Sequence, residues 1–142
     1  MLWENGRYFL LDYHMNRLEK SALFFSFQMD RSTLEQALLN SASSLEGRKR
    51  YRCRVLLDKT GDFSIDTEIL GPSPATPVRV AVSDRRVDRN DVFFRHKTTK
   101  RDLYDKELAK YRDLGFFDVI FMNTDGEVTE GAITNIVAKE GG

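Results

Sequence analysis

The chain has 142 residues, enough to bury the core of one ordinary domain, with 41% hydrophobic and 31% charged residues. This composition is typical of soluble globular proteins and argues against an intrinsically disordered or membrane-embedded chain. Because 22 basic residues balance 22 acidic ones, the formal net charge is zero, which provides no general attraction to nucleic acid or anionic membranes.

The cysteine content and the apolar runs of the chain indicate in which cellular compartment the protein is expected. Cys53 is the only cysteine, so an internal disulfide is excluded, and a reducing cytoplasm is the expected environment. No apolar run approaches the ~20 residues that a membrane span needs. Residues 1–6 already contain a charged residue and a predicted turn, so they lack the apolar stretch of a signal peptide. We therefore expect a cytoplasmic protein that contacts no membrane.

The first third of the chain predicts a hairpin and two helices. Asn5-Gly6 stands between the apolar runs 2–3 and 8–11, and both residues tolerate positive φ, which favours a tight hairpin turn. Asp12 is the expected cap of a helix that runs to about Phe27, with apolar residues at three- and four-residue spacing. Ser32 and Glu35 match a capping box and predict a second amphipathic helix over 33–46.

The middle of the chain predicts a second hairpin and a connector. Residues 50–58 and 62–70 flank Lys59-Thr-Gly61 and are typical of two antiparallel strands, the later one with a solvated face. Residues 71–77 contain all three prolines, so they can continue neither helix nor sheet. Residues 78–83 are then expected to form a buried strand.

The last part predicts a crossover, a helix and further strands. Residues 84–99 are polar without periodicity and are expected to cross between two lobes. A helix over 100–114 should end at Gly115. Strands are expected at 117–122 and within 127–139, separated by a turn at 123–126. Since most of these strands are joined by hairpins, the predicted class is α+β.

Three segments carry side chains suited to catalysis. They are His14-Met-Asn-Arg17-Leu18, Phe94-Arg-His96-Lys97-Thr98-Thr99-Lys-Arg101, and Gly126-Glu-Val-Thr-Glu130-Gly131-Ala-Ile-Thr134-Asn135-Ile136. In this order they resemble the phosphate-binding, lysine and cofactor segments of class IV (fold type IV) aminotransferases, which use pyridoxal 5′-phosphate (PLP). The residues around Lys97 are most similar to those of 4-amino-4-deoxychorismate lyase, including the form fused to para-aminobenzoate synthase.

The resemblance implies a role for each of five residues. Lys97 would be the Schiff-base lysine, whereas a lone lysine is ordinarily a solvated surface charge. Arg17 would bind the cofactor phosphate, a task suited to a bidentate guanidinium. The alternative is an exposed helix arginine, but none of its neighbours three or four residues away is a carboxylate. Glu130 would bind the protonated pyridine nitrogen rather than being a solvated charge. Thr134 and Asn135 would lie near the ring or the phosphate.

Other polar residues receive structural interpretations. Tyr104 shares a predicted helix face with Leu108 and Tyr111 and is expected in the core, while His14 and His96 are expected to be structural. Two histidines and a distant cysteine make no metal site. Arg50, Arg52 and Arg54 alternate on a predicted strand, so a solvated face is the first interpretation. Binding of substrate carboxylates is the second, and nucleic acid is a remote third.

The resemblance also implies an architecture and an activity. It predicts a small α+β lobe over 1–83, a crossover over 84–99 that carries Lys97, and the first part of a larger barrel-like lobe over 100–142. Family members extend further at both ends, so the chain is expected to be truncated. The implied reaction releases pyruvate from 4-amino-4-deoxychorismate and gives 4-aminobenzoate for folate biosynthesis.

Two alternatives stay open for the function. One is a class IV aminotransferase for branched-chain or D-amino acids, since the three segments serve both reactions. The other is an inactive fragment or non-catalytic remnant of the same fold. A small-molecule amine substrate and a homodimer are the expected partners, with no nucleic acid.

Overall fold

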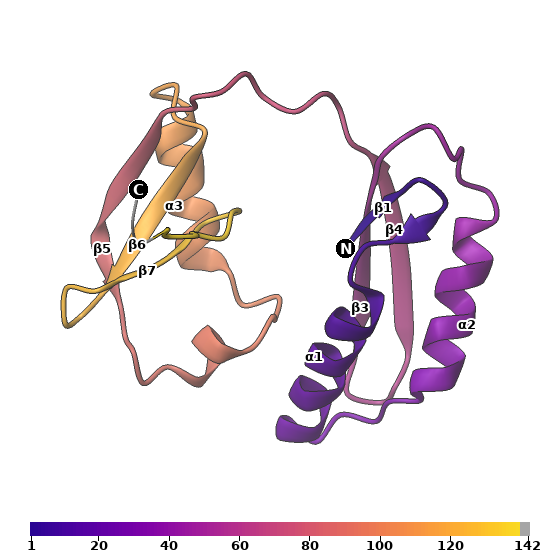
Figure 1. Cartoon of the computed structure of the whole chain (residues 1–142). Coiled ribbons are helices and arrows are strands. Elements are labelled where there is room, and N and C mark those ends of the chain that lie inside the picture. The colour runs from indigo at the N-terminus through magenta and orange to yellow at the C-terminus, as the bar shows by residue number, and fades with distance from the viewer. Residues whose placement is uncertain (140–142) are drawn as a thin grey trace. The chain divides into compact units, whose positions relative to one another are not determined.

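The computed structural model describes residues 1–139, which fold into two compact units (Figure 1). The first unit is Met1–Ser73, and the second begins at Pro74. Elements of the first unit are β1 (Leu2–Glu4), β2 (Arg7–Tyr8), α1 (Leu11–Phe24), α2 (Arg31–Ala42), β3 (Tyr51–Leu57) and β4 (Phe63–Ile69). Those of the second are β5 (Val80–Val87), the 3₁₀-helix η1 (Val92–Arg95), α3 (Asp102–Arg112), β6 (Asp118–Asn123) and β7 (Val128–Gly131). The units divide before residue 83, where the sequence predicts the end of the first lobe.

A four-stranded antiparallel sheet in the order β2-β1-β3-β4 forms the base of the first unit. The tight turn between β1 and β2 has φ of 52° at Asn5 and 77° at Gly6, which confirms the predicted hairpin. The second predicted hairpin is also confirmed, with Tyr51 opposite Ile69 and Leu57 opposite Phe63.

Both helices of the first unit begin earlier than predicted. The residue before α1 is Leu10, in the left-handed region, and no side chain caps this helix, so the predicted cap at Asp12 is wrong. Asp12 lies in the first turn, where a negative charge favours the helix dipole. The capping box at Ser32 and Glu35 is also wrong, because Asp30 caps α2 by accepting the Thr33 amide at 3.1 Å. Glu35 instead pairs with Arg31 at 2.7 Å.

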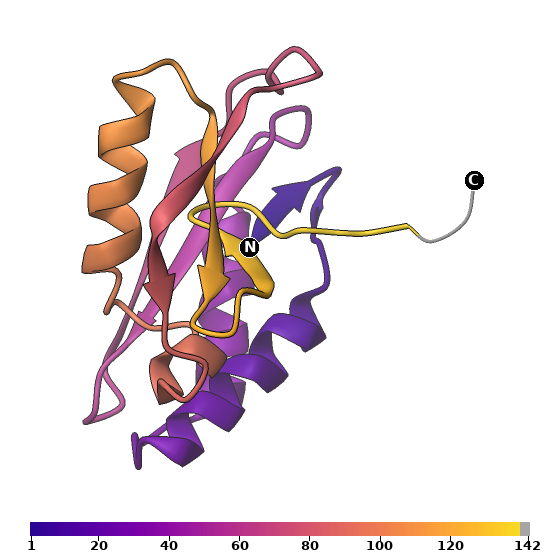
Figure 2. The same cartoon turned by 90° about the vertical axis from the view of Figure 1, so that its left-hand side faces the viewer.

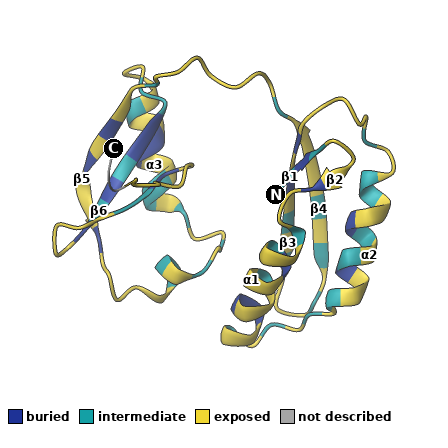
Figure 3. Cartoon of the chain, viewed as in Figure 1, coloured by how far each residue is buried: buried dark blue, intermediate teal, exposed yellow. Residues whose placement is uncertain are grey.

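The core of the first unit lies between its sheet and the two helices. Tyr51 and Cys53 alternate on β3 and point inward, toward Met15 of α1 and Leu34 and Leu38 of α2. Arg52 and Arg54 lie on the opposite, exposed face of the same strand. Figure 3 shows the buried positions on the inner sides of these elements.

The proline-rich segment 71–77 forms neither helix nor strand, as predicted, and leads into the second unit. The strand that follows, β5, is longer than predicted and runs through residues 84–87, which the sequence places in the crossover. It is buried on one side only, through Ala81, Ser83 and Val87, so the expected buried strand is exposed on its other face. Residues 92–95 form η1, so the predicted irregular stretch is also partly ordered.

The second unit is a three-stranded sheet in the order β5-β6-β7 with α3 against it (Figures 1 and 2). β5 and β6 run parallel and are joined through η1 and α3, while β6 and β7 form an antiparallel hairpin. The sequence predicted mostly strands joined by hairpins, so the parallel pairing of β5 with β6 was not expected. Gly115 has φ of 81° just after α3, in agreement with its predicted role at the helix end.

The core of this second unit contains Val119 and Phe121 of β6, Leu108 of α3, Val87 and Ala132. After β7 the chain up to residue 139 forms no further strand, so only four residues of the predicted stretch 127–139 are in a sheet. Among the helices of residues 1–139, none combines the length and the apolar character needed to cross a membrane.

Candidate active site

Lys97 lies in the non-helical segment that connects η1 to α3. Its side chain is exposed, and it stands five residues before Asp102, where the helix begins. The segment is shaped locally at both ends. Asp91 caps η1 by accepting the Phe93 amide at 2.9 Å, and the Thr98 hydroxyl accepts the Lys100 amide at 3.3 Å. An extended loop of this kind presents the lysine amine outside any regular element.

Glu130 is the third residue of β7 and is half-buried. Its Oε1 accepts a hydrogen bond from the Tyr104 hydroxyl of α3 at 3.0 Å. The Tyr104 ring is held in turn by Phe121, whose ring centroid lies 4.7 Å away in an edge-to-face arrangement. Tyr104 therefore occupies the predicted core position and, in addition, contacts the predicted site carboxylate.

Burial and the neighbouring Glu130 carboxylate both raise the pKa of Tyr104 far above its ordinary value. Burial is the larger cause, because it disfavours the phenolate. The hydroxyl therefore stays protonated over the physiological range and donates its hydrogen to Glu130.

The segment after β7 folds around Asp118, a residue that the sequence analysis missed. Asp118 is completely buried at the start of β6. Its carboxylate accepts the amides of Val119 at 2.8 Å, Ile133 at 3.2 Å and Thr134 at 3.0 Å, and the Thr134 hydroxyl at 2.5 Å. A charged residue within an otherwise apolar predicted strand was the available signal, because buried carboxylates need dedicated partners.

Gly131 lies where this loop approaches Asp118 most closely. A Cβ atom there would collide with the Asp118 carboxylate and would lie 2.6 Å from Thr134 Oγ1 and 2.9 Å from the Thr134 carbonyl oxygen. The absence of a side chain at 131 thus allows the tight turn that brings Thr134 onto Asp118. Asn135 follows directly and is exposed.

Arg101 ties the same loop to α3. Its guanidinium donates to the Ala132 carbonyl at 2.5 Å, pairs with Asp105 at 3.4 Å and lies 5.5 Å from the Tyr104 ring centroid. Helix α3 therefore holds the end of β7 at two points, Glu130 through Tyr104 and Ala132 through Arg101.

Arg17 lies on α1 in the first unit, with its side chain exposed. Its guanidinium is 3.4 Å from Nδ1 of His14, one turn earlier, and no carboxylate pairs with it among residues 1–139. The structure thus supports the sequence argument that a local ion pair does not account for this arginine. An exposed guanidinium of this kind is suited to binding an anion.

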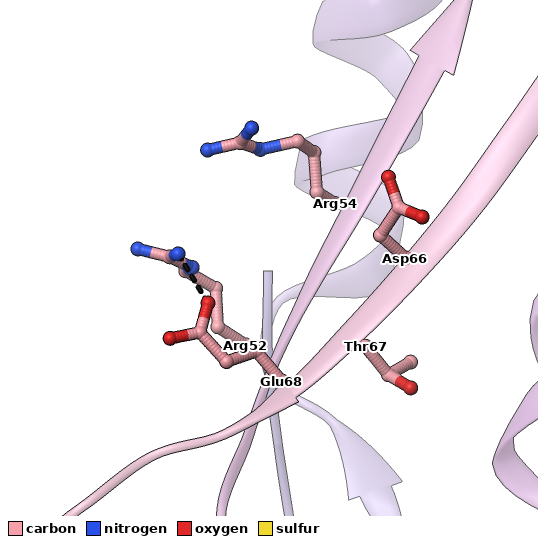
Figure 4. A pocket seen from close by; sticks show the side chains of 5 residues that line it. All are labelled: Arg52, Arg54, Asp66, Thr67 and Glu68. Carbon is pink, nitrogen blue, oxygen red and sulfur yellow. Dashed lines mark hydrogen bonds and ion pairs between the residues drawn. The ribbon is translucent and has the colours of Figure 1, made fainter.

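Arg52 and Arg54 of β3, with Arg50 directly before the strand, form a solvated face, as first predicted. Arg52 pairs with Glu68 across the hairpin, and with Arg54, Asp66 and Thr67 these residues line a shallow hollow of about 100 Å³ (Figure 4). Arg50 pairs with Glu4 at 3.3 Å. Acidic residues thus partner two of the three arginines, which does not favour a nucleic-acid site. No group of three or more metal-binding side chains occurs in the described part of the chain.

Comparison with known families places this arrangement. The model of one family, amino-transferase class IV, matches residues 1–142. The chain belongs to the class IV aminotransferase family. By family it is an enzyme that depends on pyridoxal phosphate.

Solved structures agree with this membership. A Mesorhizobium loti protein assigned as an amino-acid aminotransferase is 30% identical over 99% of this chain and 68% of that protein, with a TM-score of 0.87. A Haemophilus somnus protein assigned as a 4-amino-4-deoxychorismate lyase shares the fold at 20% identity, over 93% of this chain and 64% of that one, with a TM-score of 0.68.

A hypothetical aminotransferase from Mycobacterium tuberculosis, solved with α-ketoglutarate and PMP, shares the fold at 22% identity and a TM-score of 0.75. It covers 92% of this chain, which spans 53% of the mycobacterial protein. The class IV chain described here is therefore shorter than each of these three relatives. A search of curated proteins found no match.

The side chains of the class IV chain fit pyridoxal phosphate by their chemistry. The second oxygen of Glu130, Oε2, has no hydrogen-bond partner within residues 1–139, so it can accept a pyridinium N–H. Lys97 has an exposed amine and Arg17 an exposed guanidinium, and their contacts with the aldehyde and the phosphate stay predictions. The amide and the hydroxyl of Thr134 are both engaged with Asp118, so its predicted contact with the cofactor stays a prediction.

Proposed function

We propose that the protein is a PLP-dependent lyase that converts 4-amino-4-deoxychorismate into 4-aminobenzoate and pyruvate. The cofactor assignment is supported chiefly by the Glu130 carboxylate, which Tyr104 fixes through one oxygen while the other is open to a ring nitrogen. The choice of lyase is supported by the residues His96-Lys97-Thr98-Thr99, and fold neighbours assigned as such lyases agree with it.

Each residue has a defined task in this proposal. Bound pyridoxal phosphate supplies an electron sink for the pair left when a proton is removed beside the amine. Lys97 would hold the cofactor by its aldehyde carbon until the substrate amine replaces it. The released Lys97 amine would then take the proton from the amine-bearing ring carbon. Cleavage of the ether bond would release the enolpyruvyl group, which takes up a proton to become pyruvate, and the ring would become aromatic.

Glu130 and Arg17 would fix the cofactor rather than react. Glu130 would hold the ring nitrogen protonated, because a carboxylate beside it stabilises the positive charge. Arg17 would bind the phosphate. A homodimer is the proposed assembly, in keeping with the family resemblance.

A second candidate is an amino-acid aminotransferase. The Mesorhizobium loti relative favours it, because that protein is assigned to this activity and is 30% identical, more than the fold neighbours assigned as lyases. The same Lys97 would then move a proton from the amino-acid carbon to the cofactor carbon. The two reactions share the cofactor residues and differ in their products.

The first experiment addresses the cofactor. The purified chain is mixed with pyridoxal phosphate, reduced with borohydride and mapped by peptide mass spectrometry. We expect a pyridoxyl group on Lys97, none at that position in Lys97→Ala, and an unchanged adduct in Lys100→Ala. A folded chain without any adduct on Lys97 would identify a non-catalytic remnant of the fold.

The second experiment separates the two reactions. Wild type and Lys97→Ala are incubated with 4-amino-4-deoxychorismate, or with branched-chain or D-amino acids and 2-oxoglutarate. Release of 4-aminobenzoate and pyruvate in equal amounts, dependent on Lys97, supports the lyase. Formation of glutamate without 4-aminobenzoate would reject the lyase and support the aminotransferase.

A further inference from the structure

In the hydrogen bond between Tyr104 and Glu130, the tyrosine is the donor and the carboxylate is the acceptor. The Tyr104 hydroxyl donates to Oε1, and at 3.0 Å the contact has ordinary hydrogen-bond geometry. A carboxylate held by one oxygen keeps two acceptor positions on the other, Oε2. The donor therefore restricts rotation of the carboxylate while leaving it able to accept from a second partner.

Tyr104 is itself fixed by its surroundings on α3. Its ring packs against Phe121, a residue with 0% exposure, and it belongs to the hydrophobic core of the second unit. Arg101, one turn earlier, binds the Ala132 carbonyl two residues beyond Glu130. The hydroxyl is thus presented by a packed ring on a helix that is anchored to the same end of β7.

We propose that Tyr104 is a positioning residue, which orients Glu130 so that Oε2 faces the pyridine nitrogen of bound pyridoxal phosphate. This inference rests on the proposed function, because it presupposes the contact between Glu130 and the cofactor. Tyr104 does not touch the cofactor in this arrangement. It acts by removing freedom from the carboxylate, so the contact with the ring is formed without reordering the side chain.

The contact can be tested without cofactor by a double-mutant cycle on stability. The free energy of unfolding is measured by urea denaturation for wild type, Tyr104→Phe, Glu130→Ala and the double variant. We expect the two substitutions to be coupled, because each removes one partner of the same hydrogen bond. Additive effects of the two substitutions would mean that the hydrogen bond does not exist, and the inference would be overturned.

The positioning role requires a double-mutant cycle with cofactor. We expect Tyr104→Phe to weaken binding of pyridoxal phosphate roughly three- to tenfold, and to shift the pH at which the bound-cofactor band changes in the same direction as Glu130→Gln. In the Glu130→Gln background, Tyr104→Phe should change affinity by less than about twofold, since the carboxylate that binds the ring nitrogen is gone. A merely structural role would give the same loss in both backgrounds.

Tyr111→Phe is the matched control. Tyr111 lies on the same helix, packs on the same core and donates to the Val82 carbonyl at 3.5 Å, away from Glu130. It should leave affinity and spectrum unchanged. If wild type binds cofactor and Tyr104→Phe behaves as Tyr111→Phe does, the positioning role alone fails. If the folded wild type takes up no cofactor, the proposed function fails, and the role toward the ring falls with it.

Discussion

Asp118 and Thr134 are joined by two hydrogen bonds, from the Thr134 amide at 3.0 Å and from its hydroxyl at 2.5 Å, both to Oδ2. One residue opens β6, and the other lies three residues beyond β7. The pair closes the loop of residues 131–134 onto a carboxylate that has no contact with solvent. This loop follows Glu130 directly, so its closure contributes to holding the end of β7 in place.

Replacing Asp118 by alanine should destabilise the second unit. Three backbone amides and one hydroxyl would lose their acceptor, and each unsatisfied buried donor costs about 1–3 kcal/mol. We expect a loss of at least about 2 kcal/mol in the free energy of unfolding, measured by urea denaturation. Asp84→Ala is the control, since its side chain is 86% exposed, and equal effects of the two substitutions would disprove the anchoring role.

Gly131→Ala should disturb the same loop by steric overlap. The added Cβ would meet the Asp118 carboxylate and the carbonyl oxygen of Thr134, which cannot move independently of the backbone. We expect a destabilisation of about 1–3 kcal/mol by denaturation. Gly47→Ala is matched, because nothing lies within 4 Å of its Cβ position, and it should change stability by less than about 1 kcal/mol. A neutral Gly131→Ala would contradict the close packing.

The sequence predicted elements well wherever a local pattern decides the structure. The turn at Asn5-Gly6 and the hairpin around Gly61 follow from residues that favour positive φ. The first residues of the helices were harder to predict from the sequence, because more than one nearby residue could serve as the cap. Near α2, Asp30 and Ser32 are both good capping residues, and the chain uses Asp30. The parallel pairing of β5 with β6 depends on long-range packing, which no local pattern encodes.

The candidate site shows the same division between local and long-range information. Lys97, Glu130 and Arg17 were predicted from motifs, because their chemistry is tied to neighbouring residues in the sequence. Asp118 and the contact of Tyr104 with Glu130 were missed, since they join residues 16 and 26 positions apart. A tyrosine on a core face gives no indication of where its hydroxyl points until the fold brings β7 beside α3.

The cap of α2 should make stability depend on pH at the acid end. Hydrogen bonds from Ser32 and Thr33 lower the pKa of the Asp30 carboxyl from 3.8 to about 2. A depressed folded pKa contributes stability above the unfolded value, and this contribution is lost as pH falls through the folded value. We therefore expect Asp30→Ala to lower the melting temperature at pH 7, with the difference from wild type shrinking between about pH 4 and pH 2.

Ser32→Ala serves as the comparison for this cap. Ser32 donates to Asp30 at 2.7 Å but caps nothing itself, so its removal should affect the melting temperature less than removal of Asp30. A larger effect of Ser32→Ala than of Asp30→Ala at pH 7 would mean that Ser32, as the sequence predicted, caps α2.

Arg17 provides the most direct test of how the phosphate is held. Because Arg17 is exposed and pairs with no carboxylate within residues 1–139, Arg17→Ala should leave the free energy of unfolding nearly unchanged. Loss of a charged hydrogen bond to the phosphate should weaken binding of pyridoxal phosphate about tenfold or more, as measured by fluorescence titration. Binding of pyridoxal, which lacks the phosphate, should be equally weak in wild type and variant. Lys20→Ala, on the same helix, should alter neither affinity. A parallel loss for both ligands would show that Arg17 supports the fold of the site rather than the phosphate.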